Sequence, residues 1–342
     1  MNTSCEQNVE HIENGSNAID NVSSDIEKMS ISTDNISVCA NCGKEGVDVT
    51  NTCNKCKSVM YCNAACKKKH RHKHKKVCEE HLKRAEEHAA KVHDEKLFKQ
   101  PPSLFEDCPI CMIRLPTLNT GRVYMNCCGK MICSGCIHAP VYDDKGNKVT
   151  EKTCPFCRTP FAASDEENLN KLEKRIELND AHAIYIMGCY YALGRYGKTQ
   201  NNAMALELWL RAVELGHSQS YNNIGHSYKN GRGVEVDNKK AIHHYELSAM
   251  EGNVTARHNL GCMEKQVGNM DRALKHWMIA VKDGYSNSLR KVKELYTNGQ
   301  ATKDEYAKAL RSHQTYLDQI KSDQRDEAAS FADDYKYYES AS

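Results

Sequence analysis

Paired cysteines in the first half of this 342-residue chain constrain its fold more than any other feature. Fifteen of the 18 cysteines lie between Cys39 and Cys157, many of them as pairs separated by two residues. A Cys-x2-Cys pair forms a short knuckle that can point two sulfur atoms at one metal ion. In a reducing compartment, such clustering favours metal binding over disulfide bonds.

The N-terminal sequence MNTSCEQNVEHIENGSNAID is polar and lacks the apolar run of a signal peptide. No stretch of the chain approaches the roughly 20 apolar residues that a membrane-spanning helix needs. We therefore expect an intracellular protein, cytoplasmic or nuclear or both, that has no membrane partner.

The first cysteine cluster holds eight candidate ligands, enough for two tetrahedral zinc ions. They are Cys39, Cys42, Cys53, Cys56, Cys62, Cys66, His74 and Cys78. His74 and Cys78 are four residues apart, so one face of a helix would present both. His70 competes with His74 by spacing, and the sequence leaves that choice open.

This pattern, including the Tyr61–Cys62 pair, resembles the MYND-type zinc finger over residues 39–78. The resemblance implies two interleaved sites, formed by Cys39, Cys42, Cys62 and Cys66 and by Cys53, Cys56, His74 and Cys78. MYND fingers dock short, often proline-rich peptides, so a peptide motif is the expected partner. Lys67 and Arg71 replace the glutamine and tryptophan common in that family, a departure that affects the peptide groove rather than the metal sites.

The basic run KKKHRHKHKK, residues 67–76, raises the alternative of nucleic-acid binding. Its seven lysines and arginines also offset the negative charge of thiolate-rich metal sites beside them. The run lacks the interleaved aromatic residues that stack on single strands, and the formal net charge of the chain is only +2. We therefore favour charge compensation and do not expect a nucleic-acid partner.

The second cluster opens with Cys108-Pro-Ile-Cys111 and closes with Cys154-Pro-Phe-Cys157. Many zinc modules place a histidine where this chain has Lys130, and a protonated lysine amine has no lone pair for a metal. We predict that the adjacent Cys127 and Cys128 supply both ligands of this middle position. The eight ligands are then Cys108, Cys111, Cys127, Cys128, Cys133, Cys136, Cys154 and Cys157.

This cluster resembles the RING finger in its all-cysteine variant, over residues 108–157. The resemblance implies one zinc on Cys108, Cys111, Cys133 and Cys136 and another on Cys127, Cys128, Cys154 and Cys157, which brings the expected total to four zinc ions. RING domains commonly act as ubiquitin ligases, without a nucleophile of their own, by holding a ubiquitin-charged conjugating enzyme in a reactive geometry. The residues that match the family's contacts to that enzyme are Ile110, Pro155, Phe156 and Arg158. The family tryptophan of the middle loop is absent, and His138, Ala139 and Pro140 lie near its place.

The second half of the chain contains an internal repeat. Gly188, Gly225 and Gly261 recur at steps of 37 and 36 residues. A second motif follows each glycine, over 205–216, 241–252 and 273–284, and its aromatic residues are Trp209, Tyr245 and Trp277. Each unit is thus expected to form two helices, with small residues where the helices cross and with the aromatic residues in packing roles.

These units resemble the Sel-one-like repeat, a relative of the tetratricopeptide repeat, over about 180–285, and a degenerate fourth unit follows. Such repeats stack into a solenoid that exposes a curved surface for protein partners. The predicted fold class is multidomain, with two small zinc-stabilised cross-brace modules followed by an all-α solenoid of helix-turn-helix repeats. The expected segments are a disordered tail (1–37), the MYND-type finger (38–78), a helical linker (79–105), the RING-type finger (106–160), a linker (161–175), the solenoid (176–322) and an acidic, aromatic tail (323–342).

Three hypotheses for the function follow. The main one is a RING-type ubiquitin ligase that recruits a charged conjugating enzyme through 108–158 and a substrate or partner through the repeats. The alternative is a non-enzymatic scaffold in which both zinc modules and the solenoid bind proteins. A weaker alternative is a transcriptional co-regulator, a role that MYND fingers often serve.

Overall fold

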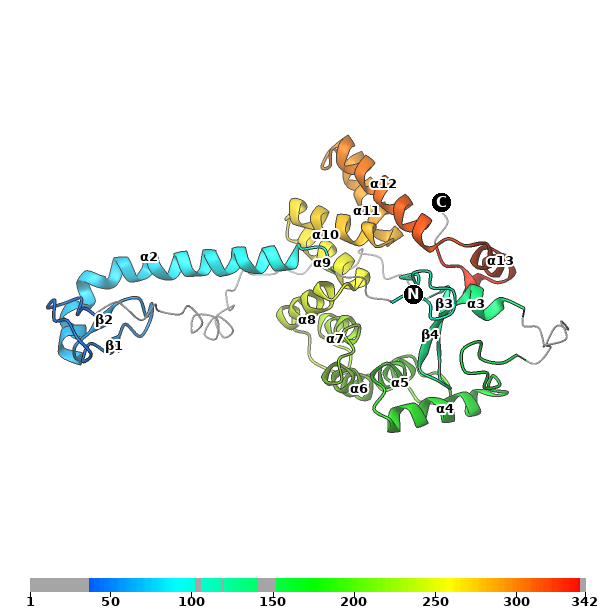
Figure 1. Cartoon of the computed structure of the whole chain (residues 1–342). Helices are drawn as coiled ribbons and strands as arrows, with labels where there is room; N and C mark the ends of the chain where they lie inside the picture. The colour runs from blue at the N-terminus through cyan, green and yellow to red at the C-terminus, as the bar shows by residue number, and fades with distance from the viewer. Residues whose placement is uncertain (1–36, 102–105, 119, 141–151, 339–342) are drawn as a thin grey trace. The chain divides into compact units, whose positions relative to one another are not determined.

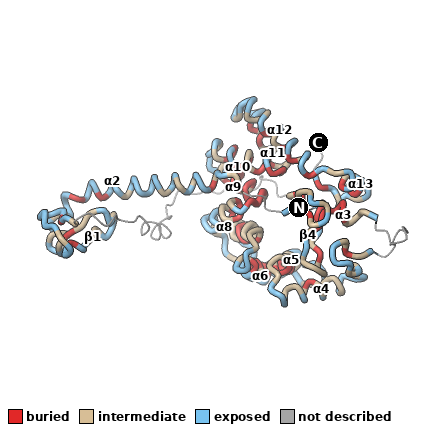
Figure 2. Tube along the Cα trace, in the orientation of Figure 1, coloured by how far each residue is buried: buried red, intermediate tan, exposed pale blue. Residues whose placement is uncertain are grey.

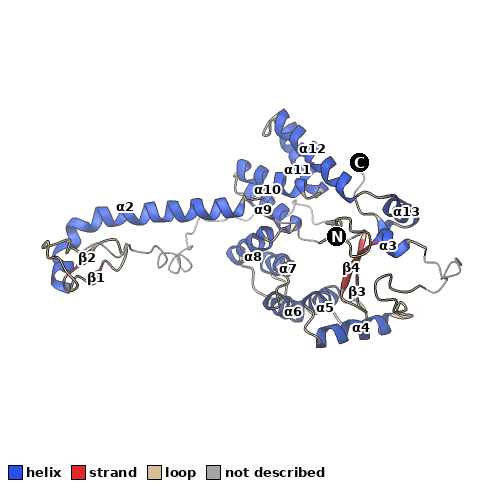
Figure 3. Cartoon of the chain, viewed as in Figure 1, coloured by secondary structure: helices blue, strands red, loops and turns tan. Residues whose placement is uncertain are grey.

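The computed structural model describes residues 37–101, 106–118, 120–140 and 152–338 (Figure 1). The predicted N-terminal tail, apart from Ser37, lies outside the described residues. The chain divides into two compact units, Met1–Leu97 and Phe98–Ser342. Within the described ranges, strands occur only in the two cysteine-rich parts and helices account for most of the remainder (Figure 3). No helix of these ranges combines the length and apolar character that crossing a lipid bilayer requires.

The first unit begins with a small antiparallel hairpin. Strand β1 (Asn51–Thr52) pairs with β2 (Met60–Tyr61), and Asn51 lies opposite Tyr61. Cys39, Val49 and Tyr61 are buried together beneath this hairpin and form its small apolar core. A core of this size cannot hold a fold by itself, so the cysteines around it must contribute to stability.

Helix α2 (Ala64–Leu97) follows the hairpin as a single helix of 34 residues. The sequence predicts a helical linker over 79–105, of which 102–105 lie outside the described residues; in the structure residues 79–97 continue the helix that carries His74 and Cys78. The reason is local, because no glycine or proline interrupts the chain between Ala64 and Leu97. No residue from Glu79 to Glu95 is buried, and Figure 2 shows this helix as mostly exposed.

The second unit contains the other cysteine-rich module. Its hairpin consists of β3 (Arg122–Met125) and β4 (Lys130–Cys133), and Arg122 pairs with Cys133. The short helix α3 (Ser134–His138) begins directly after β4. The module's core consists of four of its cysteines together with Leu115, Met125 and Ile132.

Paired helices form the rest of this unit, as the repeat pattern predicts. The first helix of each pair is α5 (Ala181–Leu193), α7 (Ser220–Asn230), α9 (Val254–Gln266) or α11 (Ser286–Thr297). The second is α6 (Asn202–Glu214), α8 (Asn238–Met250), α10 (Met270–Lys282) or α12 (Lys303–Ile320). The helices follow one another in an arc (Figure 1), and buried positions run along them (Figure 2).

The repeated glycine lies where the two helices of a pair cross. A Cβ atom on Gly188 would lie 2.6 Å from Trp209 Nε1, and one on Gly261 would lie 2.4 Å from Trp277 Nε1. The indole N–H groups donate to Tyr185 O at 3.3 Å and to His258 O at 3.2 Å, which are equivalent positions of two repeats. The prediction that Trp209, Tyr245 and Trp277 are packing residues is thus confirmed, because all three are buried against a glycine of the preceding helix.

Two segments that the sequence analysis describes only as a linker and a tail contain helices. The supposed linker 161–175 contains helix α4 (Asp165–Glu177), which begins with a Ser164 cap and packs through Leu172 on α5. The supposed C-terminal tail contains α13 (Asp323–Phe331) and the 3-10 turn η1 (Asp333–Tyr335), up to the last described residue, Tyr338. Both segments are polar in composition, so their few buried residues gave little apolar periodicity to recognise.

The cysteine-rich module of this unit is bonded to both ends of the helical array. At the first end, Tyr124 donates a hydrogen bond to Asp180, the cap of α5, at 2.6 Å. Burial would raise the pKa of Asp180, but hydrogen bonds from Tyr124 and Arg175 outweigh it and lower the pKa. At the other end, Thr117 N donates to Tyr316 Oη at 2.8 Å. Arg114 pairs with Asp283 at 2.9 Å at this same end.

We expect Gly261→Ala to reduce the free energy of unfolding by about 1–3 kcal/mol, because the added methyl group overlaps the Trp277 ring. Urea unfolding followed by circular dichroism measures this loss. The same substitution in a Trp277→Phe background should cost less, because the smaller ring leaves room. Equal losses in the two backgrounds would contradict the contact.

A buried histidine in α10 makes the second unit sensitive to acid. His276 is fully buried, it packs on Phe98 with ring centroids 4.7 Å apart, and neither ring nitrogen has a hydrogen-bond partner among the described residues. Burial, with help from Arg257 and Arg272, lowers the pKa of His276 from 6.5 to about 3. Below pH 6.5 this histidine binds a proton in the unfolded chain but stays neutral in the native chain, so the free energy of unfolding falls as the pH decreases.

We expect this histidine alone to cost about 1.4 kcal/mol of stability per pH unit below 6.5, down to its native pKa. His276→Phe keeps a similar ring but does not titrate, so its loss of stability between pH 7 and pH 5 should be about 2 kcal/mol smaller. Urea unfolding at both pH values gives the comparison, with the exposed His88→Phe as the matched control. An equal pH dependence of wild type and His276→Phe would rule out this role.

Candidate metal centres

Four of the Cys-x2-Cys pairs share one backbone conformation. In each, the N–H of the residue after the second cysteine donates to the carbonyl of the first, at 2.8–3.0 Å. That residue has a positive φ in every case: Gly43, Lys57, Met112 and Arg158. Three of them carry side chains in a conformation that favours glycine, a cost of about 1–2 kcal/mol each that the surrounding structure must offset. The repeated turn brings the two sulfur atoms of each pair together.

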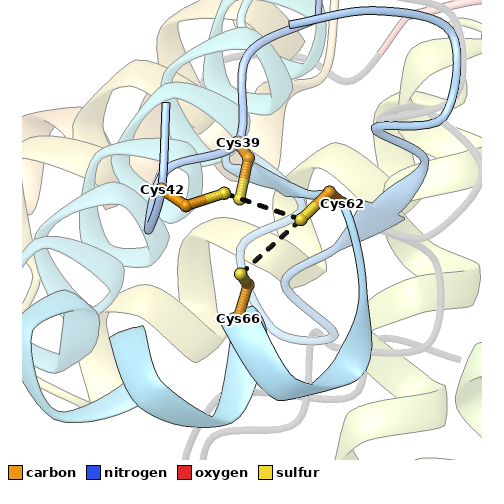
Figure 4. Close-up of side chains that lie close together, drawn as sticks. All are labelled: Cys39, Cys42, Cys62 and Cys66. Carbon is orange, nitrogen blue, oxygen red and sulfur yellow. Dashed lines mark hydrogen bonds between the residues drawn. The ribbon is translucent and has the colours of Figure 1, made fainter. Parts of the chain in front are cut away.

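The first cluster joins one such knuckle to a second cysteine pair from a distant part of the finger. Cys39 and Cys42 form the knuckle, Cys62 directly follows β2, and Cys66 lies in the first turn of α2. Figure 4 shows the four side chains pointing toward a common centre. The sulfur of Cys62 lies 3.7 Å from that of Cys42 and 3.5 Å from that of Cys66.

The second cluster interleaves with the first. Cys53 and Cys56 form its knuckle, and His74 and Cys78 come from one face of α2. Cys53 Sγ lies 3.7 Å from Cys78 Sγ, and Cys56 Sγ lies 3.3 Å from His74 Nε2. Of the two competing histidines, the structure brings His74 into the cluster. His70 instead lies with its Nδ1 atom 3.2 Å from the Tyr61 hydroxyl.

The third and fourth clusters belong to the second unit. Cys108, Cys111, Cys133 and Cys136 form one, with the sulfurs of Cys108 and Cys136 3.9 Å apart and those of Cys111 and Cys133 3.8 Å apart. Cys127, Cys128, Cys154 and Cys157 form the other, with distances of 3.9 Å from Cys128 to Cys154 and 3.4 Å from Cys157 to Cys127. Pairs from the two clusters alternate along the chain, and the second pair of the third cluster comes from the end of β4 (Cys133) and from α3 (Cys136).

The adjacent pair Cys127–Cys128 lies in the turn between β3 and β4. Cys128 N and Gly129 N both donate to Met125 O, at 3.1 and 2.8 Å. Gly129 has a φ of +71°, and this left-handed residue tightens the turn so that two consecutive side chains reach one cluster. Lys130 is not a member of this cluster, and its amine lies 5.8 Å from the centre of the Phe156 ring.

Electrostatics within the clusters call for a cation. Burial raises the pKa of Cys53, but amide donors at Cys56 and Lys55 and the contacts with His74 and Cys78 lower it to about 6. Contact with Cys66, burial and contact with Cys39 raise the pKa of Cys62 to about 12. Neighbouring thiols therefore oppose each other's ionisation, and four thiolates at these distances need a positive charge between them.

Zinc fits this donor set. The ligand atoms of each group all lie within 4.8 Å of one another. A tetrahedral zinc ion with Zn–S bonds of about 2.3 Å places its sulfur ligands about 3.8 Å apart. The sulfur–sulfur distances given above, from 3.4 to 3.9 Å, are close to this value. Four groups of cysteine and histidine thus have the composition and geometry to bind metal ions.

The four side chains with expected partner contacts lie on the two Cys-Pro-x-Cys knuckles of the second unit. Ile110 and Phe156 occupy the same knuckle position and are 40% and 44% exposed. Pro155 is partly exposed, and Arg158 is exposed directly after the second knuckle. The sequence did not indicate Arg325, which lies beside the third cluster, because it is separated from Cys111 by 214 residues.

Comparisons with known proteins agree with two parts of this architecture. The MYND finger family matches residues 39–78. The Sel1 repeat family matches residues 181–217 and 218–253. The chain carries a MYND finger followed by Sel1 repeats. The pairs α9/α10 and α11/α12 extend the same two-helix arrangement beyond the matched repeats.

Curated relatives match shorter segments. E3 ubiquitin-protein ligase DA2 of Arabidopsis thaliana is 38% identical over 73 residues, which cover 21% of this chain and 16% of that protein. E3 ubiquitin-protein ligase GW2 of Oryza sativa subsp. japonica is 35% identical over 71 residues, covering 20% and 15%. Chitin synthase regulatory factor 4 of Schizosaccharomyces pombe is 27% identical over 125 residues, covering 36% and 20%. The chain thus spans at most a fifth of the length of these relatives.

Solved structures resemble part of the chain. A Sel1 repeat protein from Oxalobacter formigenes is 27% identical with a TM-score of 0.40, and covers 44% of this chain and 64% of that one. The protective antigen c5321 of uropathogenic Escherichia coli is 21% identical with a TM-score of 0.40, covering 46% and 35%.

We expect Cys128→Ser to lower the metal content of the purified chain from four zinc ions to three, because it removes one ligand of the fourth cluster. Lys130→Ala, two residues away, should keep all four. Atomic emission spectroscopy on both variants, after dialysis against a weak chelator, gives the counts. Loss of zinc from Lys130→Ala with full retention by Cys128→Ser would show that the ligand set is wrong.

Proposed function

We propose that this protein is a RING-type ubiquitin ligase, in which the module at 106–160 recruits a ubiquitin-charged conjugating enzyme. The observation that carries the proposal is the pair of apolar side chains at matched positions of the two Cys-Pro-x-Cys knuckles. Ile110 and Phe156 are 40% and 44% exposed, whereas Leu115, Met125 and Ile132 of the same module are buried in its core. Solvent exposure of apolar side chains at repeated positions is a mark of a protein-binding surface.

The residues around this pair suit the same partner. Arg158 follows the second knuckle with an exposed side chain, and its positive φ fixes the direction in which the chain leaves the cluster. A guanidinium at this place can donate several hydrogen bonds at once, to the conjugating enzyme and to ubiquitin. Two of the partly similar relatives, DA2 and GW2, are E3 ubiquitin-protein ligases, which supports the assignment.

In the proposed reaction, the protein supplies position rather than a reacting group. The amine of a substrate lysine attacks the thioester that joins ubiquitin to the conjugating enzyme, and the thiol of that enzyme is the leaving group. Restricting the thioester to one reactive orientation reduces the entropic cost of that attack. The metal ions would serve structure, because their ligands are complete with protein side chains and leave no open position.

The other parts of the chain supply binding surfaces in this proposal. The Sel1 repeats hold a substrate or a complex partner on their curved surface. The MYND finger, whose family binds zinc, offers a second protein contact, for which we propose a short peptide motif. We propose four zinc ions in all, one for each cluster.

A non-enzymatic adaptor is the second candidate, and one observation favours it. His138 lies at the end of α3, near the place of the missing family tryptophan, and its ring packs against Phe331 and Tyr335 of the C-terminal segment, with centroids 4.8 and 5.9 Å away. Part of the middle-loop surface is therefore already in contact with the chain itself. Under this alternative the knuckle residues bind a different protein.

We expect the purified chain to form ubiquitin chains with activating enzyme and at least one member of a panel of conjugating enzymes. Ile110→Ala and Arg158→Ala should each lower the rate at least tenfold while four zinc ions are retained. Val123→Ala is the matched control, because Val123 is an apolar β3 residue of similar exposure, 41%, outside the knuckles. Absence of chains with every conjugating enzyme, from fully metallated protein, would leave the adaptor as the function.

A further inference from the structure

The C-terminal segment, residues 323–338, lies directly on the module that contains the third cluster. Helix α13 packs against α3 so closely that a Cβ atom on Gly135 would be 2.9 Å from Arg325 Cγ. Ser134 Oγ donates to Tyr335 O at 3.0 Å, and Gly121 N donates to Asp334 O at 3.4 Å. The segment is therefore attached along its length by close packing and by hydrogen bonds to backbone carbonyls.

Arg325 is the centre of this attachment. Its side chain is completely buried, an unusual environment for an arginine. The guanidinium donates to Ile320 O at 2.7 Å, to Arg114 O at 2.8 Å and to Ile113 O at 3.1 Å. Its Nη2 atom also lies 3.9 Å from Cys111 Sγ, a sulfur of the third cluster.

Nothing neutralises this charge among the other described residues. A guanidinium stays protonated in proteins, and a buried charge without a counter-ion costs several kcal/mol. No carboxylate in the described ranges lies within ion-pair distance of Arg325; the neighbouring Asp326 instead accepts a hydrogen bond from Tyr337. Carbonyl oxygens accept from the two Nη atoms of Arg325 but carry no net charge to balance it, and its buried Nε atom has no hydrogen-bond partner among the described residues.

The third cluster supplies the missing charge when it holds a metal ion. Four thiolates around a divalent cation carry a net charge of −2, and the sulfur of Cys111 lies 3.9 Å from the guanidinium. An arginine beside such a site lowers the cost of gathering four thiolates, as partners that donate to metal ligands do in other metal sites. The buried cation and the anionic site are thus each unfavourable alone and favourable together.

We propose that Arg325 is the counter-cation of the site formed by Cys108, Cys111, Cys133 and Cys136, so that metal in this site holds the C-terminal segment 323–338 on the module. The coupling is reciprocal, because whatever loosens the segment also weakens metal binding at this site. The C-terminal segment is then a metal-dependent strap over α3. This inference does not depend on ligase activity.

The test uses the full chain and three substitutions of one residue. Arg325→Gln keeps hydrogen-bond donors without the charge, Arg325→Lys keeps the charge with a single donor group, and Arg325→Met removes both. Arg311→Met, on the exposed side of α12, is the control for the loss of an arginine. Competition with a zinc chelator measures the affinity of each variant for its metal ions, and amide hydrogen exchange measures the protection of residues 323–338.

We expect Arg325→Met and Arg325→Gln to lower the affinity of the chain for one of its four metal ions about 10–100-fold. Both variants should also show faster amide hydrogen exchange in residues 323–338. Arg325→Lys should retain that ion better than Arg325→Gln, and Arg311→Met should match the wild type. If Arg325→Gln retains metal as well as or better than Arg325→Lys, the charge is not what matters and the proposal fails. The proposal would also be overturned if Arg325→Met showed faster amide exchange in residues 323–338 but bound all four metal ions with the affinity of the wild type.

Discussion

The convergence of sulfur atoms on four centres is the constraint on which the rest of this structure depends. The finger around Cys39 and Tyr61 and the module around Cys108 and Ile132 contain too few apolar residues to fold on burial alone. Their chains reverse direction through knuckles whose backbone is strained at Lys57, Met112 and Arg158. Such turns are stable only if something holds the side chains together, and the donor set matches a divalent metal ion.

A second interaction, the packing of a glycine against an aromatic ring, holds the two helices of each repeat together. It needs no metal, because Trp209, Tyr245 and Trp277 fill the space that three glycines leave open. The cysteine-rich module and the repeats are in contact within the second unit, where Tyr124 hydrogen-bonds to the cap of α5 and Thr117 hydrogen-bonds to α12. The stability of the repeat helices and that of the cysteine-rich module are consequently linked within one compact unit.

Much of this arrangement could be predicted from the sequence because its signals are local. Cys-x2-Cys spacing predicts a knuckle, and glycines at steps of 37 and 36 residues predict a helix pair, without knowledge of the rest of the fold. The exclusion of Lys130 followed from the chemistry of its amine alone. The C-terminal segment was missed because α13 is polar, and its key residue, Arg325, contacts Arg114 and Cys111, which are more than 200 residues away along the chain. Helix α4 was missed for a related reason, since Leu172 is the one buried residue that its own element supplies.

The bonds between the module and both ends of the array have an evolutionary consequence. Open solenoids commonly gain or lose whole units, because each unit contacts only its neighbours. Here an inserted or deleted helix pair would displace Asp180 relative to Tyr316, while their partners Tyr124 and Thr117 remain fixed a few residues apart on the same module. The module therefore limits the number of repeats that the array can contain. Duplication of a repeat, which an open solenoid tolerates, would break one of these two hydrogen bonds in this protein.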